Sequence, residues 1–187
     1  MTPDAKVKVL YNFTHGKDGA NPIGLVQASD GNFYGTSMSG GNHFEGGTLF
    51  RAKLIGASLT VTPLHVFESK TGSFPYGALF QHTNGTLYGD TFSGGGFGKG
   101  VFYSFDAGLP PFVTYLPTYG RAGALVQILG QGFTEDSVVS FNGVPADFTL
   151  VYSTYIRANV PDGATTGPIT VTTADGTLTS NKVFIVH

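Results

Sequence analysis

A tandem repeat of about 54 residues constrains this chain more than any other feature of its sequence. Apolar and aromatic residues recur 54 positions apart: Val7, Leu10 and Phe13 correspond to Val61, Leu64 and Phe67. The same offset places Tyr34-Gly35 on Tyr88-Gly89 and the Ser-Gly-Gly run at 39–41 on that at 93–95. Segments 22–24 and 47–50 recur after 53 positions, so one-residue slips fall in loops. A fixed period of this kind indicates a repeat architecture.

Each repeat reads as four short β-strands separated by turn residues. The expected strands are residues 7–13, 24–28, 33–37 and 47–53, followed by 61–67, 78–82, 86–91 and 100–105. The dipeptides Asp30-Gly31 and Asn84-Gly85 favour tight hairpins, because both central residues of such a turn need a positive φ. No segment shows convincing helical periodicity. The sequence therefore predicts an all-β chain.

The composition agrees with a turn-rich β protein and excludes several classes of function. Glycine supplies 28 of the 187 residues, whereas the average is about 7%. Ten Lys plus Arg against 12 Asp plus Glu give a formal net charge of −2, so no basic surface is expected for nucleic acid. The absence of cysteine excludes disulfides, thiolate metal sites and a cysteine nucleophile.

The sequence shows no membrane-inserting or targeting segment. No run approaches the ~20 apolar residues of a membrane span, and the segment beginning at Met1 does not start a signal peptide. We therefore expect no membrane insertion and interpret the chain as a mature or trimmed form.

A composition change at Leu109-Pro110-Pro111 marks an expected domain boundary, because the 54-residue period stops there. The expected organisation is a repeat domain over residues 1–108, a linker over 109–111 and a second domain over 112–187. In the second domain the expected strands are 125–129, 138–141, 147–151, 155–160, 169–173 and 182–186. Short strands at this spacing predict a small β-sandwich.

The second domain, residues 111–187, resembles the IPT/TIG family of immunoglobulin-like domains. The matching motifs are Pro117-Thr118-Tyr119-Gly120, Gly130-Gln131-Gly132-Phe133, Phe141-Asn142-Gly143-Val144-Pro145 and Thr166-Gly167-Pro168. Leu116 stands where the family commonly has serine. The resemblance implies an Ig-like sandwich without catalytic residues, in an exported or surface protein of bacteria.

Residues 5–108 resemble the GloVer tandem repeat of bacterial surface proteins. The matching residues are Asp18-Gly19, Pro22, Asn32-Phe33-Tyr34-Gly35-Thr36-Ser37, Gly40-Gly41 and Gly47-Thr48-Leu49-Phe50, with a looser second copy. The rhythm of the strands also looks like that of kelch blades, which implies a β-propeller. The resemblance implies a cell-surface setting and no established activity.

The number of strands leads to an expectation about assembly. Eight repeat strands make two blades, whereas propellers contain about 4–8. By analogy with kelch blades, residues 7–13 form an outermost strand, and the second blade ends without one. We therefore expect this segment of one chain to complete the second blade of a neighbour, in a homotrimer with six blades or a homotetramer with eight. The open alternative is that the chain is a fragment of a longer propeller.

Five residues are candidates for ligand binding. Tyr34 and Tyr88 share one repeat position, and a tyrosine ring can stack on a sugar while its hydroxyl forms hydrogen bonds. His43, Phe44 and Phe97 lie in glycine-rich loops, where binding residues often occur. The alternatives are packing of the tyrosines between blades and flexible connecting loops.

No catalytic, metal-binding or cofactor-binding motif is recognisable. The histidines show no metal-ligand spacing, and Asp18-Gly19 and Asp30-Gly31 are explained by turns. We therefore expect no cofactor and no metal.

These observations favour a secreted or cell-surface binding or adhesion protein that recognises a glycan through an oligomeric propeller face. Two alternatives remain open, a glycosidase or polysaccharide lyase with an accessory IPT/TIG domain and an architectural surface spacer. The repeated aromatic positions favour binding, because no acid–base pair recurs in the repeat.

Overall fold

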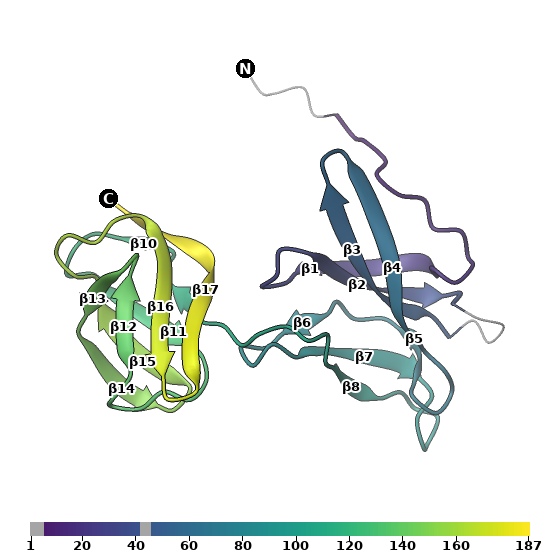
Figure 1. Cartoon of the computed structure of the whole chain (residues 1–187). Coiled ribbons are helices and arrows are strands. Elements are labelled where there is room, and N and C mark those ends of the chain that lie inside the picture. Colours follow the sequence, from purple (N-terminus) through teal and green to yellow (C-terminus); the bar gives the residue numbers. More distant parts are fainter. Residues whose placement is uncertain (1–5, 42–45) are drawn as a thin grey trace. The chain divides into compact units, whose positions relative to one another are not determined.

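The computed structural model describes residues 6–41 and 46–187, which form strands and loops without a helix. They divide into two units (Figure 1), Met1–Gln81 with Leu87–Phe105 and His82–Thr86 with Asp106–His187. The short segment His82–Thr86 lies inside the second repeat but packs with the second unit, where the Phe112 amide donates a hydrogen bond to the Thr83 carbonyl over 2.9 Å. The all-β prediction is confirmed.

The first repeat sheet contains four antiparallel strands in the order β1-β2-β3-β4. The strands are β1 (Ala20–Gln27), β2 (Phe33–Ser39), β3 (Thr48–Ile55) and β4 (Ser58–Val66). Strand β4 includes most of the segment expected to begin the second repeat. The expected strand over residues 61–67 therefore closes the first sheet, as an outermost strand does in a kelch blade.

The second repeat sheet repeats this arrangement with three of the four positions filled. Its strands are β5 (Ser73–Pro75), β6 (Phe80–Gln81), β7 (Leu87–Ser93) and β8 (Phe102–Phe105). Short strands β5 and β6 pair with β7 and take the place of β1, while β8 takes the place of β3. No strand in the described part of the chain pairs with the outer edge of β8.

The two sheets correspond in their strand register and side-chain hydrogen bonds. Tyr34 lies opposite Arg51, and Tyr88 lies opposite Ser104. The Ser37 hydroxyl accepts a hydrogen bond from the Thr48 amide, and the Thr91 hydroxyl accepts one from the Val101 amide, both over 3.1 Å. The offset between the repeats changes by one residue at the equivalent place in the two sheets. In the first sheet this place is the bulge in β1 between Pro22 and Leu25, and in the second it is the break between β5 and β6.

The strand expected over residues 7–13 does not form in the single chain. Residues 6–14 have no strand partner, and the Val7 side chain is 98% exposed. The physical reason is that the first repeat sheet already has its four strands, so its hydrogen-bonding edge next to β3 is occupied by β4. The strand was expected to pair with a neighbouring chain, so its formation stays a prediction.

Two expected turns also form differently from the prediction. Gly31 and Gly85 have positive φ, but Asp30 and Asn84 do not. Instead, the Asp30 carboxylate and the Asn84 side-chain carbonyl accept hydrogen bonds from amides two residues further on, over 3.0 and 2.9 Å. These side chains therefore build Asx turns rather than tight hairpins with two left-handed residues.

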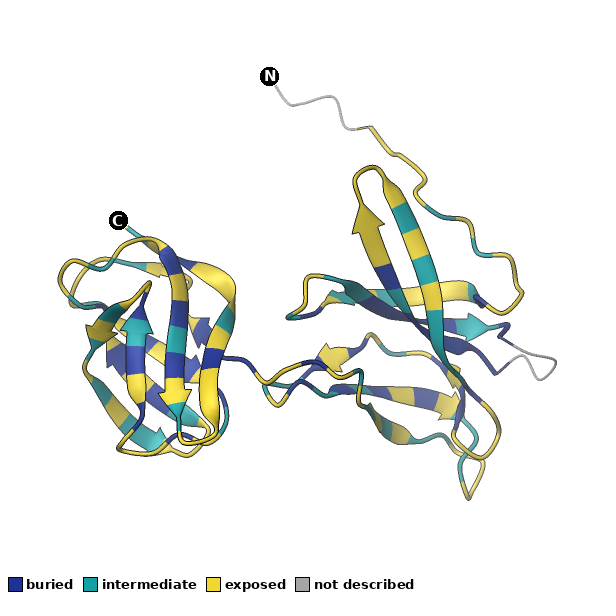
Figure 2. Ribbon diagram, viewed as in Figure 1, coloured by how far each residue is buried: buried dark blue, intermediate teal, exposed yellow. Residues whose placement is uncertain are grey.

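The second unit is an immunoglobulin-like sandwich of two sheets, ordered β10-β17-β16-β12-β13 and β14-β15-β11-β9. The strands are β9 (Thr114–Leu116), β10 (Tyr119–Gly120), β11 (Leu125–Leu129), β12 (Val138–Phe141), β13 (Val144–Ala146), β14 (Phe148–Tyr152), β15 (Tyr155–Asn159), β16 (Gly167–Thr173) and β17 (Gly176–Val186). Buried and exposed residues alternate along its strands (Figure 2). The buried core includes Ile128, Phe141 and Phe184. Asn142 and Gly143 both have positive φ, as the hairpin between β12 and β13 requires.

Asp18 ties the N-terminal segment to the first repeat sheet. Its buried carboxylate accepts hydrogen bonds from the Tyr11 hydroxyl over 2.8 Å, the Thr14 amide over 3.0 Å and the Thr14 hydroxyl over 2.5 Å. Burial by itself raises the pKa of Asp18, but these hydrogen bonds outweigh it and hold the pKa below its ordinary value. Because the folded-state pKa lies below the unfolded one, the carboxylate stabilises the fold above about pH 4.

We therefore expect the first unit to lose this stabilisation as the pH falls through the lowered pKa of Asp18. The substitution Asp18→Asn is expected to lower the free energy of unfolding at neutral pH by about 1 kcal/mol, since a charge-assisted acceptor becomes neutral. Urea titrations of both proteins between pH 2 and 7 measure this effect, and the exposed Asp162 provides a control substitution to Asn. Equal acid dependence of wild type and Asp18→Asn would contradict the assignment.

Candidate functional site

An aromatic groove on the first unit is the candidate functional site. It has a volume of about 350 Å³, and its lining residues come from β2, β5, the segment after β5 and the end of β7: Met38, Phe74, Tyr76, Phe92 and Ser93. Phe74, Tyr76 and Phe92 all have exposed rings. We call this surface the aromatic groove.

The pairing of β5 with β7 assembles the groove. Ser73 lies opposite Ser93, and Pro75 lies opposite Thr91, which brings residues on either side of Pro75 beside the end of β7. The Phe74 amide donates a hydrogen bond to the Gly46 carbonyl over 2.8 Å. These contacts position the aromatic rings on a backbone that is held by the sheet.

Phe74 adopts a backbone conformation that its residue type disfavours. Its φ is 58°, and its counterpart in the first repeat, Asn21, has a φ of 55°. Asparagine enters this left-handed region readily, whereas a bulky residue there is a rare outlier. Such strain concentrates at ligand-binding sites. The second repeat thus places a strained aromatic residue where the first has a residue suited to the turn.

The described residues of the groove offer stacking surfaces and hydroxyl groups but no charge. None of its five lining residues is acidic, basic or a histidine, and its polar side-chain groups are the hydroxyls of Tyr76 and Ser93. This arrangement suits an uncharged ligand with flat apolar faces and hydroxyl groups. It supplies no group for proton transfer near neutral pH.

Tyr34, which was expected to bind a ligand, does not line this groove. Tyr34 is buried in β2, and its hydroxyl donates a hydrogen bond to the Asp30 carboxylate over 3.0 Å. Burial, together with this hydrogen bond, raises the pKa of Tyr34. Its ring therefore packs inside the repeat unit and presents no surface to a ligand in this chain.

The other expected residues have different surroundings. Tyr88 is half-buried, and its ring stacks on Phe102 with centroids 5.8 Å apart. Phe97 is exposed in the loop before β8 and is not among the residues that line the groove. His43 and Phe44 lie outside the described residues. Ligand binding by Tyr88, Phe97, His43 and Phe44 stays a prediction.

Sequence reasoning missed the three aromatic residues of the groove. Their counterparts in the first repeat are Asn21, Ile23 and Met38. Tyr34 and Tyr88 are candidates because the same residue type recurs in both repeats, whereas these three positions are aromatic only in the second repeat. The signal that could have found them is the departure from the repeat, where the second copy gains an aromatic ring.

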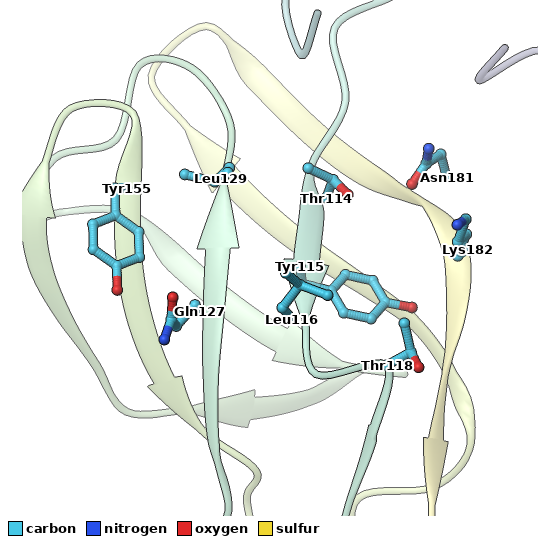
Figure 3. Close-up of a pocket in the computed structure, with 9 residues that line it drawn as sticks. All are labelled: Thr114, Tyr115, Leu116, Thr118, Gln127, Leu129, Tyr155, Asn181 and Lys182. Carbon is cyan, nitrogen blue, oxygen red and sulfur yellow. The ribbon is translucent and has the colours of Figure 1, made fainter. Parts of the chain in front are cut away.

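A second pocket lies on the sandwich and has a volume of about 480 Å³. Figure 3 shows its lining residues on β9, β11, β15 and β17 and the loop after β9: Thr114, Tyr115, Leu116, Thr118, Gln127, Leu129, Tyr155, Asn181 and Lys182. The Tyr155 hydroxyl accepts a hydrogen bond from Arg157 Nε over 2.9 Å. This bond raises the pKa of the exposed Arg157 guanidinium. The aromatic residues of this pocket are the buried Tyr115 and the half-buried Tyr155, so it offers less stacking surface than the groove.

Two further searches of the structure gave no site. Within residues 6–41 and 46–187, no group of three His, Asp or Glu side chains is placed to hold a metal ion. In the same part of the chain, no helix has the length and apolar character needed to cross a membrane.

Two solved structures are similar to parts of this chain. A putative phosphatase from Bacteroides thetaiotaomicron VPI-5482 is 30% identical over 41% of this chain and 18% of its own, with a TM-score of 0.36. A fungal alcohol oxidase of the AA5 family, solved in complex with copper, is 18% identical over 89% of this chain and 42% of its own, with a TM-score of 0.29. The chain thus spans less than half of either protein, and similarity at these TM-scores carries no argument about function.

The family comparisons are more informative. No curated protein matches the chain. The Gloeobacter/Verrucomicrobia repeat model matches residues 1–144, and the IPT/TIG domain model matches residues 110–186. Both are typical of extracellular proteins, and together they indicate a surface or adhesion-type protein. The chain therefore belongs to the Gloeobacter/Verrucomicrobia repeat family and carries an IPT/TIG domain after the repeats.

Proposed function

We propose that this protein is a non-catalytic binding protein of the bacterial surface, and that its aromatic groove holds a glycan. The observation that carries the proposal is the group of three exposed aromatic rings, Phe74, Tyr76 and Phe92, in one uncharged groove. The family assignment supports the surface setting. The groove supports the choice of ligand.

The chemistry of the groove matches that of a neutral saccharide. The C–H faces of a sugar ring pack against aromatic rings, while its hydroxyl groups need hydrogen-bond partners at the rim. Tyr76 provides both in one side chain. Since none of the lining residues that the structure describes is basic, a neutral sugar fits the groove better than an anionic ligand.

A carbohydrate-active enzyme is the second candidate, and the groove favours it less. Most glycosidases place two carboxyl groups about 5–9.5 Å apart across the bond that is cleaved. No Asp or Glu is among the described residues that line the aromatic groove. An architectural spacer is the third candidate. A spacer does not need exposed or strained aromatic residues, so these residues favour a binding protein.

Tyr76→Ala is expected to weaken glycan binding about tenfold, which corresponds to ~1.4 kcal/mol. A glycan array first identifies a bound saccharide, and calorimetric titration then compares the variants. Tyr152→Ala is the matched control, because Tyr152 on the sandwich is 69% exposed and Tyr76 is 64% exposed.

Three results would overturn the proposal. They are an array without a bound glycan, equal affinities of Tyr76→Ala and wild type, and new reducing ends or unsaturated products after incubation with a polysaccharide. The last result would establish an enzyme, and the first would favour a spacer.

A further inference from the structure

The outer edge of β8 lacks the strand that its counterpart has. In the first repeat sheet, the chain turns at Gly56-Ala57 after β3 and returns as β4, which pairs along the whole of β3. After β8 the chain does not turn back but continues at Asp106 into the second unit. The hairpin that completes the first sheet is therefore absent from the second.

Residues 6–12 are the counterpart of β4, because the 54-residue offset places them on residues 60–66. They have no strand partner in their own chain. Over residues 6–9 the valines at positions 7 and 9 alternate with Lys6 and Lys8, and the alternation ends at Leu10, which is followed by Tyr11. Alternation of this kind is typical of a strand with one covered face.

The aromatic residue after each of these two segments packs on the sheet that follows in the chain. Phe67 follows β4 out of the first sheet and packs on Tyr103 of the second sheet, with ring centroids 5.0 Å apart. Phe13 packs in the same way on Phe50 of the first sheet, over 5.2 Å. By this correspondence, residues 6–12 are placed to be the outer strand of a sheet that precedes the first one.

Residues at equivalent positions of the two repeat sheets differ in exposure, and the differences agree with a missing neighbour on each outer face. Leu49 on β3 is fully buried, whereas its counterpart on β8, Phe102, is 76% exposed. On the opposite side, Leu79 of the second repeat is 5% exposed, whereas its counterpart in the first, Leu25, is 59% exposed. The described residues thus contain one complete interface between sheets and, on the outer sides of the two sheets, surfaces that correspond to the two halves of another.

We propose that residues 6–12 of a second copy of this chain pair with the outer edge of β8, and that the first repeat sheet of that copy covers the exposed face around Phe102. The pairing is antiparallel, as between β3 and β4. The repeat predicts the register: Thr62 lies opposite Arg51 and Thr60 opposite Lys53, so Lys8 pairs with Ser104 and Lys6 with Asp106. The second pair brings opposite charges together.

This contact is head-to-tail, so it repeats until the assembly closes into a ring. Three copies supply six sheets and four supply eight, both within the usual range of propellers. The association also covers an edge that would otherwise promote aggregation. It involves residues other than those that the glycan proposal requires, so either proposal can fail without the other.

Disulfide trapping tests the register, because the chain has no cysteine of its own. The double variant Lys8→Cys/Ser104→Cys is expected to form disulfide-linked multimers under mild oxidation. Two control variants keep Lys8→Cys and move the second cysteine, to Phe105 on the other face of β8 or to the exposed Thr172 of the sandwich. Equal cross-linking in all three proteins would overturn the predicted register.

Light scattering of the full chain tests the assembly itself. The expected molar mass is three or four times the 19.6 kDa of one chain. The double variant Val7→Asp/Val9→Asp is expected to lower the mass to that of one chain, since charges at these positions cannot enter a covered strand face. Both side chains are exposed in the single chain, so the substitutions leave its fold intact. A wild-type mass of one chain, or a variant mass equal to that of an oligomeric wild type, overturns the proposal.

Discussion

Phe184→Ala is expected to lower the free energy of unfolding of the sandwich by about 3–5 kcal/mol. Phe184 on β17 is buried, and its ring contacts Phe141 at a centroid distance of 5.2 Å and Tyr115 at 5.8 Å. Removing this ring leaves a cavity between the two sheets, because the surrounding aromatic rings cannot all collapse into it. Denaturant titration with amide-exchange mass spectrometry measures the effect separately in each unit.

The neighbouring residue provides the control for this substitution. Ile185 follows Phe184 on the same strand, but its side chain is 46% exposed, so Ile185→Ala is expected to have an effect several times smaller. Similar losses for the two variants would show that the inward face of β17 does not carry the packing energy of the sandwich.

Gly100→Ala is expected to lower the free energy of unfolding of the repeat unit by about 3 kcal/mol, combining backbone strain with a steric clash. Gly100 has a φ of 94°, and an added Cβ would lie 2.2 Å from the Thr91 carbonyl oxygen. That oxygen belongs to the backbone of β7, which is paired on both sides. The clash therefore cannot be relieved by a side-chain rotation.

Gly98→Ala separates the two contributions. Gly98 has a φ of 68°, but nothing lies within 4 Å of its Cβ position, so only the left-handed conformation is penalised, by about 1–2 kcal/mol. The measurement is the urea midpoint of the repeat unit in both variants. Equal midpoints would show that β7 moves to accept the new methyl group.

Local sequence patterns predicted much of this fold. The turn at Asn142-Gly143 formed as expected, because its conformation depends on two adjacent residues. Strands β11 and β12 match the expected ranges, because each is a short apolar run that ends at turn residues, Gly130 and Asn142-Gly143. The turns at Asp30 and Asn84 differed, since the side-chain hydrogen bonds that replaced a tight hairpin depend on where the flanking strands end.

The candidate site was less predictable than the strands. Tyr34 and Tyr88 share a repeat position, yet one is buried and the other half-buried, so the repeat position alone does not fix how far a side chain is covered. Phe74, Tyr76 and Phe92 become one groove through the pairing of β5 with β7. Sequence spacing contains no information about this proximity.

Patterns along the chain were enough to predict the repeat and the all-β class, since both depend on turn residues and short apolar runs, and short motifs carried the IPT/TIG resemblance. Packing in three dimensions established which strand closes which sheet and which faces stay uncovered. The physical reason is that an edge or a face is satisfied by whatever lies beside it in space, and β4 occupies the place next to β3 that residues 6–12 would otherwise need.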